Sequence, residues 1–164
     1  MKSVILIRHA KSSWDNISLK DFDRPLNERG EKDAAKMAKR LLKKDVKIDA
    51  FLTSPAKRAY TTCKYFADEY DVKEKKIIQI QNLYEPSVEA FYEAIQNADD
   101  DFKTIAIFSH NPGITAFVNQ LSRVRIDDMP TCAAFALHAD IKQWKDFQEG
   151  EKIFWFFDYP KMKE

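Results

Sequence analysis

Apolar and polar residues follow two kinds of pattern along the chain. Short runs in which most residues are apolar, many of them β-branched, are typical of buried strands and cover residues 3–7, 50–53, 77–80 and 104–109. Between these runs, apolar positions recur every three or four residues, which predicts helices over 27–44, from 54 to about 70, from 87 onwards and from 110 to about 121. Two further strands are predicted over 133–138 and 152–159.

The order of these elements predicts the fold class. Strands that alternate with helices form βαβ units, so we expect an α/β protein with a mostly parallel six-stranded sheet and helices on both faces. The last two strands follow one another with only a polar segment, 141–151, between them, so one of them is expected to be antiparallel at an edge. The 164 residues are close to the commonest domain size, and we interpret residues 1–164 as a single domain.

Two helix starts have recognisable capping residues. Asn27 precedes the first helical pattern and is a plausible N-cap. Ser54 precedes Pro55, and a serine cap followed by proline at the first helical position is a common way to begin a helix.

Composition and charge exclude several classes of protein. The chain has 27 Lys and Arg residues against 26 Asp and Glu, interspersed along the sequence, so no nucleic-acid partner is expected. The longest apolar run, 153–157, is far shorter than the roughly 20 residues of a membrane span, and we interpret it as a buried edge or core strand. The apolar stretch before Arg8 is too short for a secretion signal. Two cysteines, Cys63 and Cys132, make no disulfide framework, so we expect a cytoplasmic protein with no membrane partner.

Basic and imidazole side chains follow three of the predicted strands. Arg8 and His9 end the first strand, Arg58 lies one helical turn after the second, and His110 ends the fourth. Each residue alone would be unremarkable at such a position. Because ligands collect at the carboxyl ends of strands in an open α/β sheet, the three strand ends together predict one site.

The residue types at this site suit phosphoryl transfer. Arginine matches phosphate oxygens bidentately, and a histidine can attack phosphorus to form a covalent intermediate. Phosphoryl transfer depends mostly on positioning and on stabilising the charge of the transferring group, which this set can do without a metal. Neither a zinc-ligand spacing nor a glycine-rich nucleotide loop is present in the sequence.

The same residues resemble a known family. Arg8-His9-Ala10, the segment SPAKRA at 54–59, and Ser109-His110 resemble the histidine phosphatase superfamily, also called phosphoglycerate mutase-like. RHAKSSWD, DFDRPLNERG and SHNPG are similar to its SixA-type phosphohistidine phosphatase branch. The resemblance implies a three-layer α/β/α fold, His9 as the phosphorylated nucleophile, Arg8 and Arg58 as phosphate clamps, His110 completing the pocket, and no metal or cofactor.

The sequence departs from the family pattern at three positions. Ala10 stands where the common motif has glycine, and Asp15 stands where the mutase branch has asparagine. Many members carry a catalytic acid after the third strand, where this chain offers Glu85. Glu85 is either that acid or a surface carboxylate. Arg24 is expected to brace the loop before the first helix.

Whether Glu85 acts as a catalytic acid bears on which substrate is expected. An ester expels an alkoxide, whose conjugate acid has a pKa of about 16, and a positioned acid helps it greatly. Phosphohistidine expels an imidazole, whose ring pKa is about 6.5, and needs far less help. We therefore expect a metal-independent phosphatase that acts through phospho-His9 on a phosphohistidine-bearing protein, with a histidine phosphotransfer domain as one such partner. A small-molecule phosphomonoesterase and a non-catalytic phosphate-binding signalling module are the alternatives.

Overall fold

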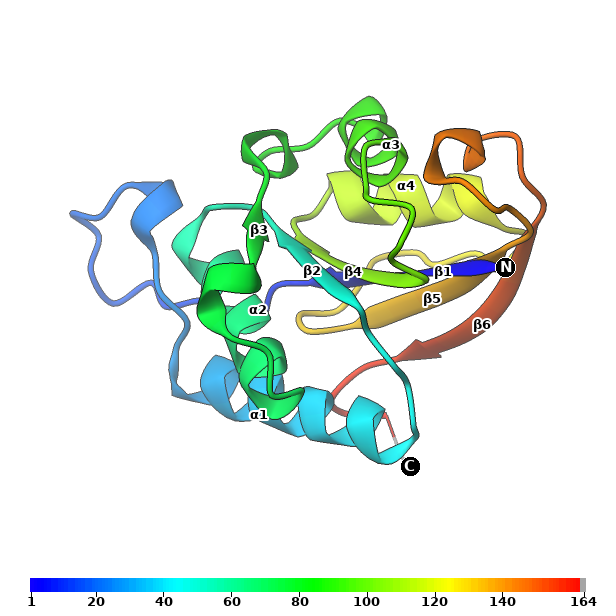
Figure 1. Ribbon diagram of the computed structural model, residues 1–164. Coiled ribbons are helices and arrows are strands. Elements are labelled where there is room, and N and C mark those ends of the chain that lie inside the picture. Colours follow the sequence, from blue (N-terminus) through cyan, green and yellow to red (C-terminus); the bar gives the residue numbers. More distant parts are fainter. Residues whose placement is uncertain (163–164) are drawn as a thin grey trace.

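The computed structural model describes residues 1–162, in which one mixed sheet lies between two layers of helices (Figure 1). Helices α1 and α2 cover one face of the sheet, and α3 and α4 cover the other. The strands are β1 (Lys2–Arg8), β2 (Ala50–Thr53), β3 (Ile78–Gln79), β4 (Thr104–Ser109), β5 (Ala134–Ala139) and β6 (Lys152–Asp158). The helices are α1 (Glu28–Lys43), α2 (Lys57–Glu69), α3 (Val88–Gln96) and α4 (Gly113–Leu121), with short 3-10 turns that include η1 (Asp21–Asp23), η3 (Gln81–Leu83) and η4 (Trp144–Asp146).

The six strands lie in the order β3-β2-β4-β1-β5-β6. β3, β2, β4 and β1 are parallel neighbours, so the predicted mostly parallel α/β sheet is confirmed. The expectation that the antiparallel strand lies at an edge is wrong: β5 is antiparallel to β1 on one side and to β6 on the other. β1 is buried on both faces and needs a partner along each side, and β5 supplies the second one.

Successive side chains of β1 point to opposite faces of the sheet, and both faces are covered, which explains why the sequence of this strand is continuously apolar. Val4 and Leu6 face the core under α3 and α4, whereas Ile5 and Ile7 face the core under α1 and α2. All four side chains are fully buried. In a strand covered by helices on both faces no side chain faces solvent, so no position favours a polar residue.

The two predicted helix caps have different outcomes. Asn27 caps α1 as expected, because its side chain accepts a hydrogen bond from the N–H of Gly30 at 2.8 Å. The prediction for Ser54 is wrong: α2 begins at Lys57, and its N-cap is Ala56. The Ser54 side chain is turned instead toward the carboxyl end of β4, where it takes part in the site described below.

The structure of three segments differs from what their pattern of apolar and polar residues predicts. The strand predicted over 77–80 is reduced to the two residues of β3, both exposed at the sheet edge. The segment 141–151, which reads as polar, contains the fully buried Trp144 and Phe147. β6 is the opposite edge of the sheet, and its Ile153 and Phe154 are exposed, so the prediction of a buried run at 153–157 holds only in part.

The parallel register brings three strand ends to one place. Arg8 is aligned with Ser109 across β1 and β4, and Thr53 with Phe108 across β2 and β4. The alignment of β1 with β4 extends one residue beyond β1, because the His9 N–H donates to Ser109 O at 3.1 Å. The residues that follow the three strands therefore meet at the same edge.

Candidate active site

His9 lies at the centre of this edge and is almost completely buried. Its Nδ1 is 2.7 Å from the carbonyl oxygen of Ala10, and because a carbonyl can only accept, Nδ1 carries the ring proton. The other ring nitrogen, Nε2, therefore carries an unprotonated electron pair, which accepts a hydrogen bond of 3.4 Å from the Nε–H of Arg58. An imidazole held in this tautomer has the electron pair that the nucleophile role predicted for His9 requires.

The charge state of His9 suits this role. Burial lowers the pKa of His9 to about 3, and the positive charges of Arg58 and Arg8 add to that effect while the Ala10 hydrogen bond opposes it. The ring is consequently neutral at physiological pH. A neutral imidazole keeps the electron pair that attack on phosphorus requires.

His110 stands beside His9, with the ring centroids 5.2 Å apart. Its Nε2 shares a hydrogen bond of 2.8 Å with the hydroxyl of Ser54, which also accepts from the N–H of Ala56. Burial lowers the pKa of His110 to about 3 as well, with His9 and Arg58 contributing. When the Ser54 hydroxyl donates to Nε2, the ring proton of His110 sits on Nδ1.

Two buried nitrogen atoms at the site have no hydrogen-bond partner within residues 1–162. They are Nδ1 of His110 and Nε of Arg8. Buried polar atoms are nearly always satisfied, so such a pair on adjacent strand ends indicates a place built for an anionic ligand.

Arg8 and Arg58 supply the positive charge. Arg8 uses Nη1 to bond the carbonyl oxygen of Met129 at 2.7 Å. Burial lowers the pKa of Arg8, and the nearby charge of Arg58 adds to this, while Asp128 opposes it. Two guanidinium groups that repel one another in a buried setting are stabilised when a phosphoryl group lies between them.

A third charged residue, Asp21 on η1, was not predicted as part of the site. Its Oδ2 accepts from Nη2 of Arg58 at 2.9 Å and from the Tyr84 hydroxyl at 2.7 Å, and its backbone oxygen accepts from Nη1 of Arg58 at 2.7 Å. Partial burial works against ionisation, but the hydrogen bonds from Tyr84 and Arg58 prevail and lower the pKa of Asp21 to about 2. The carboxylate is therefore ionised and directly joined to a phosphate clamp.

Arg24 ties η1 to the loop that follows His9. It donates to Asp21 Oδ1 at 3.2 Å and to the Ser12 hydroxyl at 2.6 Å, and its guanidinium stacks 3.6 Å from the centre of the Trp14 ring. These contacts place Arg24 as a brace of the loop, in line with the expectation from sequence. Trp14 itself is largely exposed.

Tyr84 and Glu85 form the rim on the side of η3. The Tyr84 ring meets the His110 ring edge-on at 5.5 Å, and burial together with the Asp21 hydrogen bond raises the pKa of Tyr84 to about 12. Glu85 follows with a left-handed backbone, φ 49°, and an exposed side chain. Within the described part of the chain, Glu85 makes no side-chain hydrogen bond, so the structure places it near the site but not against His9.

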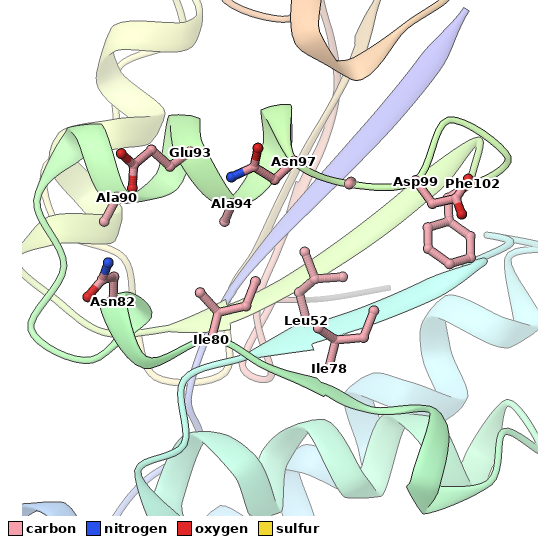
Figure 2. A pocket seen from close by; sticks show the side chains of 11 residues that line it. Leu52, Ile78, Ile80, Asn82, Ala90, Glu93, Ala94, Asn97, Asp99 and Phe102 are labelled. Atoms are coloured by element: carbon pink, nitrogen blue, oxygen red, sulfur yellow. The ribbon is translucent and has the colours of Figure 1, made fainter.

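A separate cavity lies elsewhere in the molecule. It has a volume of about 550 Å³ and opens between α3 and the edge strand β3, where Figure 2 shows Leu52, Ile78 and Ile80 facing Ala90 and Ala94. None of the residues at the carboxyl ends of β1 and β4 lines it. The arginine and histidine side chains at the strand ends therefore lie outside this cavity.

Comparison with known proteins identifies the family. The model of the histidine phosphatase superfamily (branch 1) matches residues 4–91. An uncharacterized chloroplastic protein of Arabidopsis thaliana is 35% identical over 155 residues, which cover 88% of this chain and 70% of that protein. Phosphoserine phosphatase 1 of Hydrogenobacter thermophilus is 34% identical over 87 residues, 50% of this chain and 40% of that protein. The chain belongs to the histidine phosphatase superfamily.

A solved structure shows the same fold over nearly the whole chain. The protein histidine phosphatase SixA, complexed with tungstate, aligns with a TM-score of 0.81 at 22% identity, covering 96% of this chain and 97% of that one. The predicted phosphoglycerate mutase-like, SixA-like fold is thereby confirmed. Superfamily membership supports a phosphatase activity, and the matched region 4–91 contains Arg8, His9 and Arg58.

No helix within residues 1–162 is both long and apolar enough to cross a membrane.

Proposed function

We propose that this protein removes phosphate from phosphohistidine in a protein partner, through a covalent phosphohistidine intermediate on His9. The observation that carries the proposal is the hydrogen bond from His9 Nδ1 to Ala10 O, which leaves the Nε2 electron pair toward Arg58. A histidine phosphotransfer domain is the class of partner we expect.

In the first step, Nε2 of His9 attacks phosphorus while the bond from phosphorus to the leaving group breaks and its electron pair departs with that group. Arg8 and Arg58 hold the equatorial oxygens, whose charge must be stabilised in the transition state. The two unpartnered nitrogens, Arg8 Nε and His110 Nδ1, are the donors that the transferring group would satisfy.

In the second step, water attacks phospho-His9 and releases phosphate. Nε2 recovers its electron pair, and the Nδ1 proton stays in place on the Ala10 carbonyl, so the ring departs as neutral imidazole. An imidazole that keeps its proton on the far nitrogen is a good leaving group.

This arrangement favours phosphohistidine as the substrate because nucleophile and leaving group are then the same chemical group. The phosphoryl group passes between two imidazoles, and no strong acid is needed on either side. The exposed position of Glu85 supports the same choice. So does a similar solved structure, the protein histidine phosphatase SixA, which holds tungstate, a tetrahedral oxyanion.

A phosphate ester is the second candidate substrate. The H. thermophilus relative is named a phosphoserine phosphatase, and Glu85 lies close enough to the site to raise the pKa of Tyr84 electrostatically. A cytoplasmic location, one domain over 1–164 and the absence of a cofactor remain part of the proposal.

The test is a paired turnover assay in the presence of chelator. Wild type and His9→Ala are given a phosphohistidine peptide and p-nitrophenyl phosphate, and an acid-labile, alkali-stable phosphoenzyme is sought by rapid quench. Faster release from the peptide, with the phosphoenzyme and both activities lost in His9→Ala, is the expected result. Preference for the ester would replace the proposal by the ester phosphatase, and phosphate binding without turnover would replace it by a non-catalytic binding module.

A further inference from the structure

Transfer from phosphohistidine places a proton requirement on the substrate. The phosphorylated ring leaves as neutral imidazole only if its other nitrogen carries a proton, since otherwise it would have to leave as the far more basic imidazolate. His9 meets the same requirement in the hydrolysis step, where the Ala10 carbonyl holds its distal proton. This inference rests on the proposed function and concerns the group that holds the distal proton of the substrate ring.

Asp21 is placed to be that group. The guanidinium of Arg58 separates it from His9, because Arg58 Nε faces His9 Nε2 at 3.4 Å and Nη2 faces Asp21 Oδ2 at 2.9 Å. In an in-line transfer the leaving group lies on the side of phosphorus away from His9. The Asp21 carboxylate lies on the opposite side of the Arg58 guanidinium from His9, so a ring that departs on that side meets the carboxylate.

The carboxylate has both access and capacity for another hydrogen bond. Its side chain is 51% exposed, in contrast to Arg58 at 8%. Oδ2 accepts from Arg58 and Tyr84, whereas Oδ1 accepts, among residues 1–162, only the two long bonds of 3.2 and 3.3 Å from Arg24. A substrate N–H can therefore reach Oδ1 from the solvent side without displacing the clamp.

Holding Arg58 in position does not by itself explain a carboxylate here. The backbone oxygen of Asp21 already accepts from Arg58 Nη1 at 2.7 Å. A negative charge beside a phosphate clamp weakens the binding of any anionic substrate, so it is a disadvantage unless another part of the substrate is attracted to it.

We propose that Asp21 accepts the N–H of the leaving imidazole and thereby selects phosphohistidine over phosphate esters. As the bond between phosphorus and nitrogen breaks, its electron pair returns to the ring nitrogen. The ring leaves as neutral imidazole, and its distal N–H donates a hydrogen bond to the Asp21 carboxylate. An ester expels an anion, which the same carboxylate repels.

The test compares two neighbouring substitutions of the same kind. Asp21→Asn keeps the size of the side chain and removes its charge. Asp23→Asn removes another exposed charge from the same turn η1, outside the Asp21 hydrogen bonds. Each variant is assayed for kcat/KM on the phosphohistidine peptide and on p-nitrophenyl phosphate, for inhibition by inorganic phosphate, and for its melting temperature.

Asp21→Asn is expected to lower kcat/KM on phosphohistidine by about tenfold or more, the effect of a lost hydrogen bond to a charged group, and to lower ester turnover by a clearly smaller factor, because Arg58 keeps its bond to the Asp21 backbone oxygen. It should also move the high-pH decline of kcat on phosphohistidine to lower pH, since the substrate ring then loses its proton more readily. Asp23→Asn should alter neither the ratio of the two activities nor that decline.

An equal loss on both substrates, with weaker phosphate inhibition and no movement of the decline, would show that Asp21 only holds Arg58 and would overturn the inference. Unchanged activity on both substrates would overturn it too. Failure of the proposed function is recognised separately, in the wild type, as ester turnover without phosphohistidine turnover.

Discussion

Arg58 Nε donates a hydrogen bond of 3.4 Å to His9 Nε2, so the proposed phosphate clamp is in direct contact with the nitrogen proposed to attack phosphorus. The other two nitrogens of the guanidinium bond to Asp21, which fixes the plane of the fork. The fold makes this contact possible because Arg58 stands in the first turn of α2, directly after the strand that lies two places from β1.

Replacement of Arg58 by lysine should nearly abolish activity although the charge is kept. Lysine is a single point charge and cannot bond His9, Asp21 and a phosphoryl oxygen at once. We expect kcat/KM to fall by about 100- to 1,000-fold, the typical effect of removing one donor to a transition-state oxyanion. Lys57→Ala, an exposed neighbour in the same helix, is the control and should retain full activity. A loss of less than tenfold in Arg58→Lys would contradict the clamp role.

The buried neutral histidines should make the protein sensitive to acid. His9 and His110 each have a pKa of about 3 in the folded protein, lowered mainly by burial, against about 6.5 in the unfolded chain. Above pH 6.5 neither state binds the proton, and between pH 6.5 and 3 only the unfolded state does. The free energy of unfolding should therefore fall with decreasing pH, by roughly 1.4 kcal/mol per pH unit for each histidine.

Urea unfolding from pH 7.5 to 4.5 measures this slope. His110→Gln should reduce the slope by roughly 1.4 kcal/mol per pH unit, the contribution of one buried histidine, while His9 and His138, whose pKa is also lowered by burial, keep their contributions. An unchanged slope in that variant would show that His110 is already protonated in the folded state, which would contradict the neutral ring described above.

The strand ends could be predicted from the sequence because they depend on register alone. Arg8, His9 and His110 directly follow apolar runs, and parallel register then brings them together whatever the loops do. Asp21 could not be found this way. It lies in the irregular stretch between β1 and α1, and its role depends on contacts with Arg58 and Tyr84, which are 37 and 63 residues away in sequence.

Ser54 and Gly30 show how local rules can mislead. Ser54 before proline satisfies the rule for a helix cap, but the hydroxyl bonds His110 instead. Gly30 reads as a small cost to α1, yet a Cβ at this position would collide with the carbonyl oxygen of Lys11. In both cases a tertiary contact near the site determines the residue, and no pattern along the chain records such a contact.

Ser54→Ala should impair catalysis more than stability. The substitution removes the hydroxyl that orients His110 and the acceptor for the Ala56 N–H. We expect the unfolding free energy to fall by about 1 kcal/mol and kcat to fall about tenfold, with KM less affected. Ser122→Ala removes a comparable hydroxyl, which bonds Val124 N–H at the far end of α4, and should leave kcat unchanged. Equal effects of the two variants on kcat would show that Ser54 does not position His110.

Glu85→Gln distinguishes the two leaving groups. If the substrate ring brings its own distal proton, phosphohistidine turnover needs no protein acid, and the variant should keep it within about twofold of wild type. Ester turnover is different, because an alkoxide gains about a hundredfold or more from a positioned acid, and any such help from Glu85 is lost in the variant. Initial rates on the phosphohistidine peptide and on a phosphoserine peptide, an ester that expels an alkoxide, make the comparison over pH 5 to 9, with Glu89→Gln, an exposed glutamate in the first turn of α3, as the control. A large loss on phosphohistidine that is confined to Glu85→Gln would mean that Glu85 protonates the leaving ring, and the assignment of that step to the substrate's own proton would then be wrong.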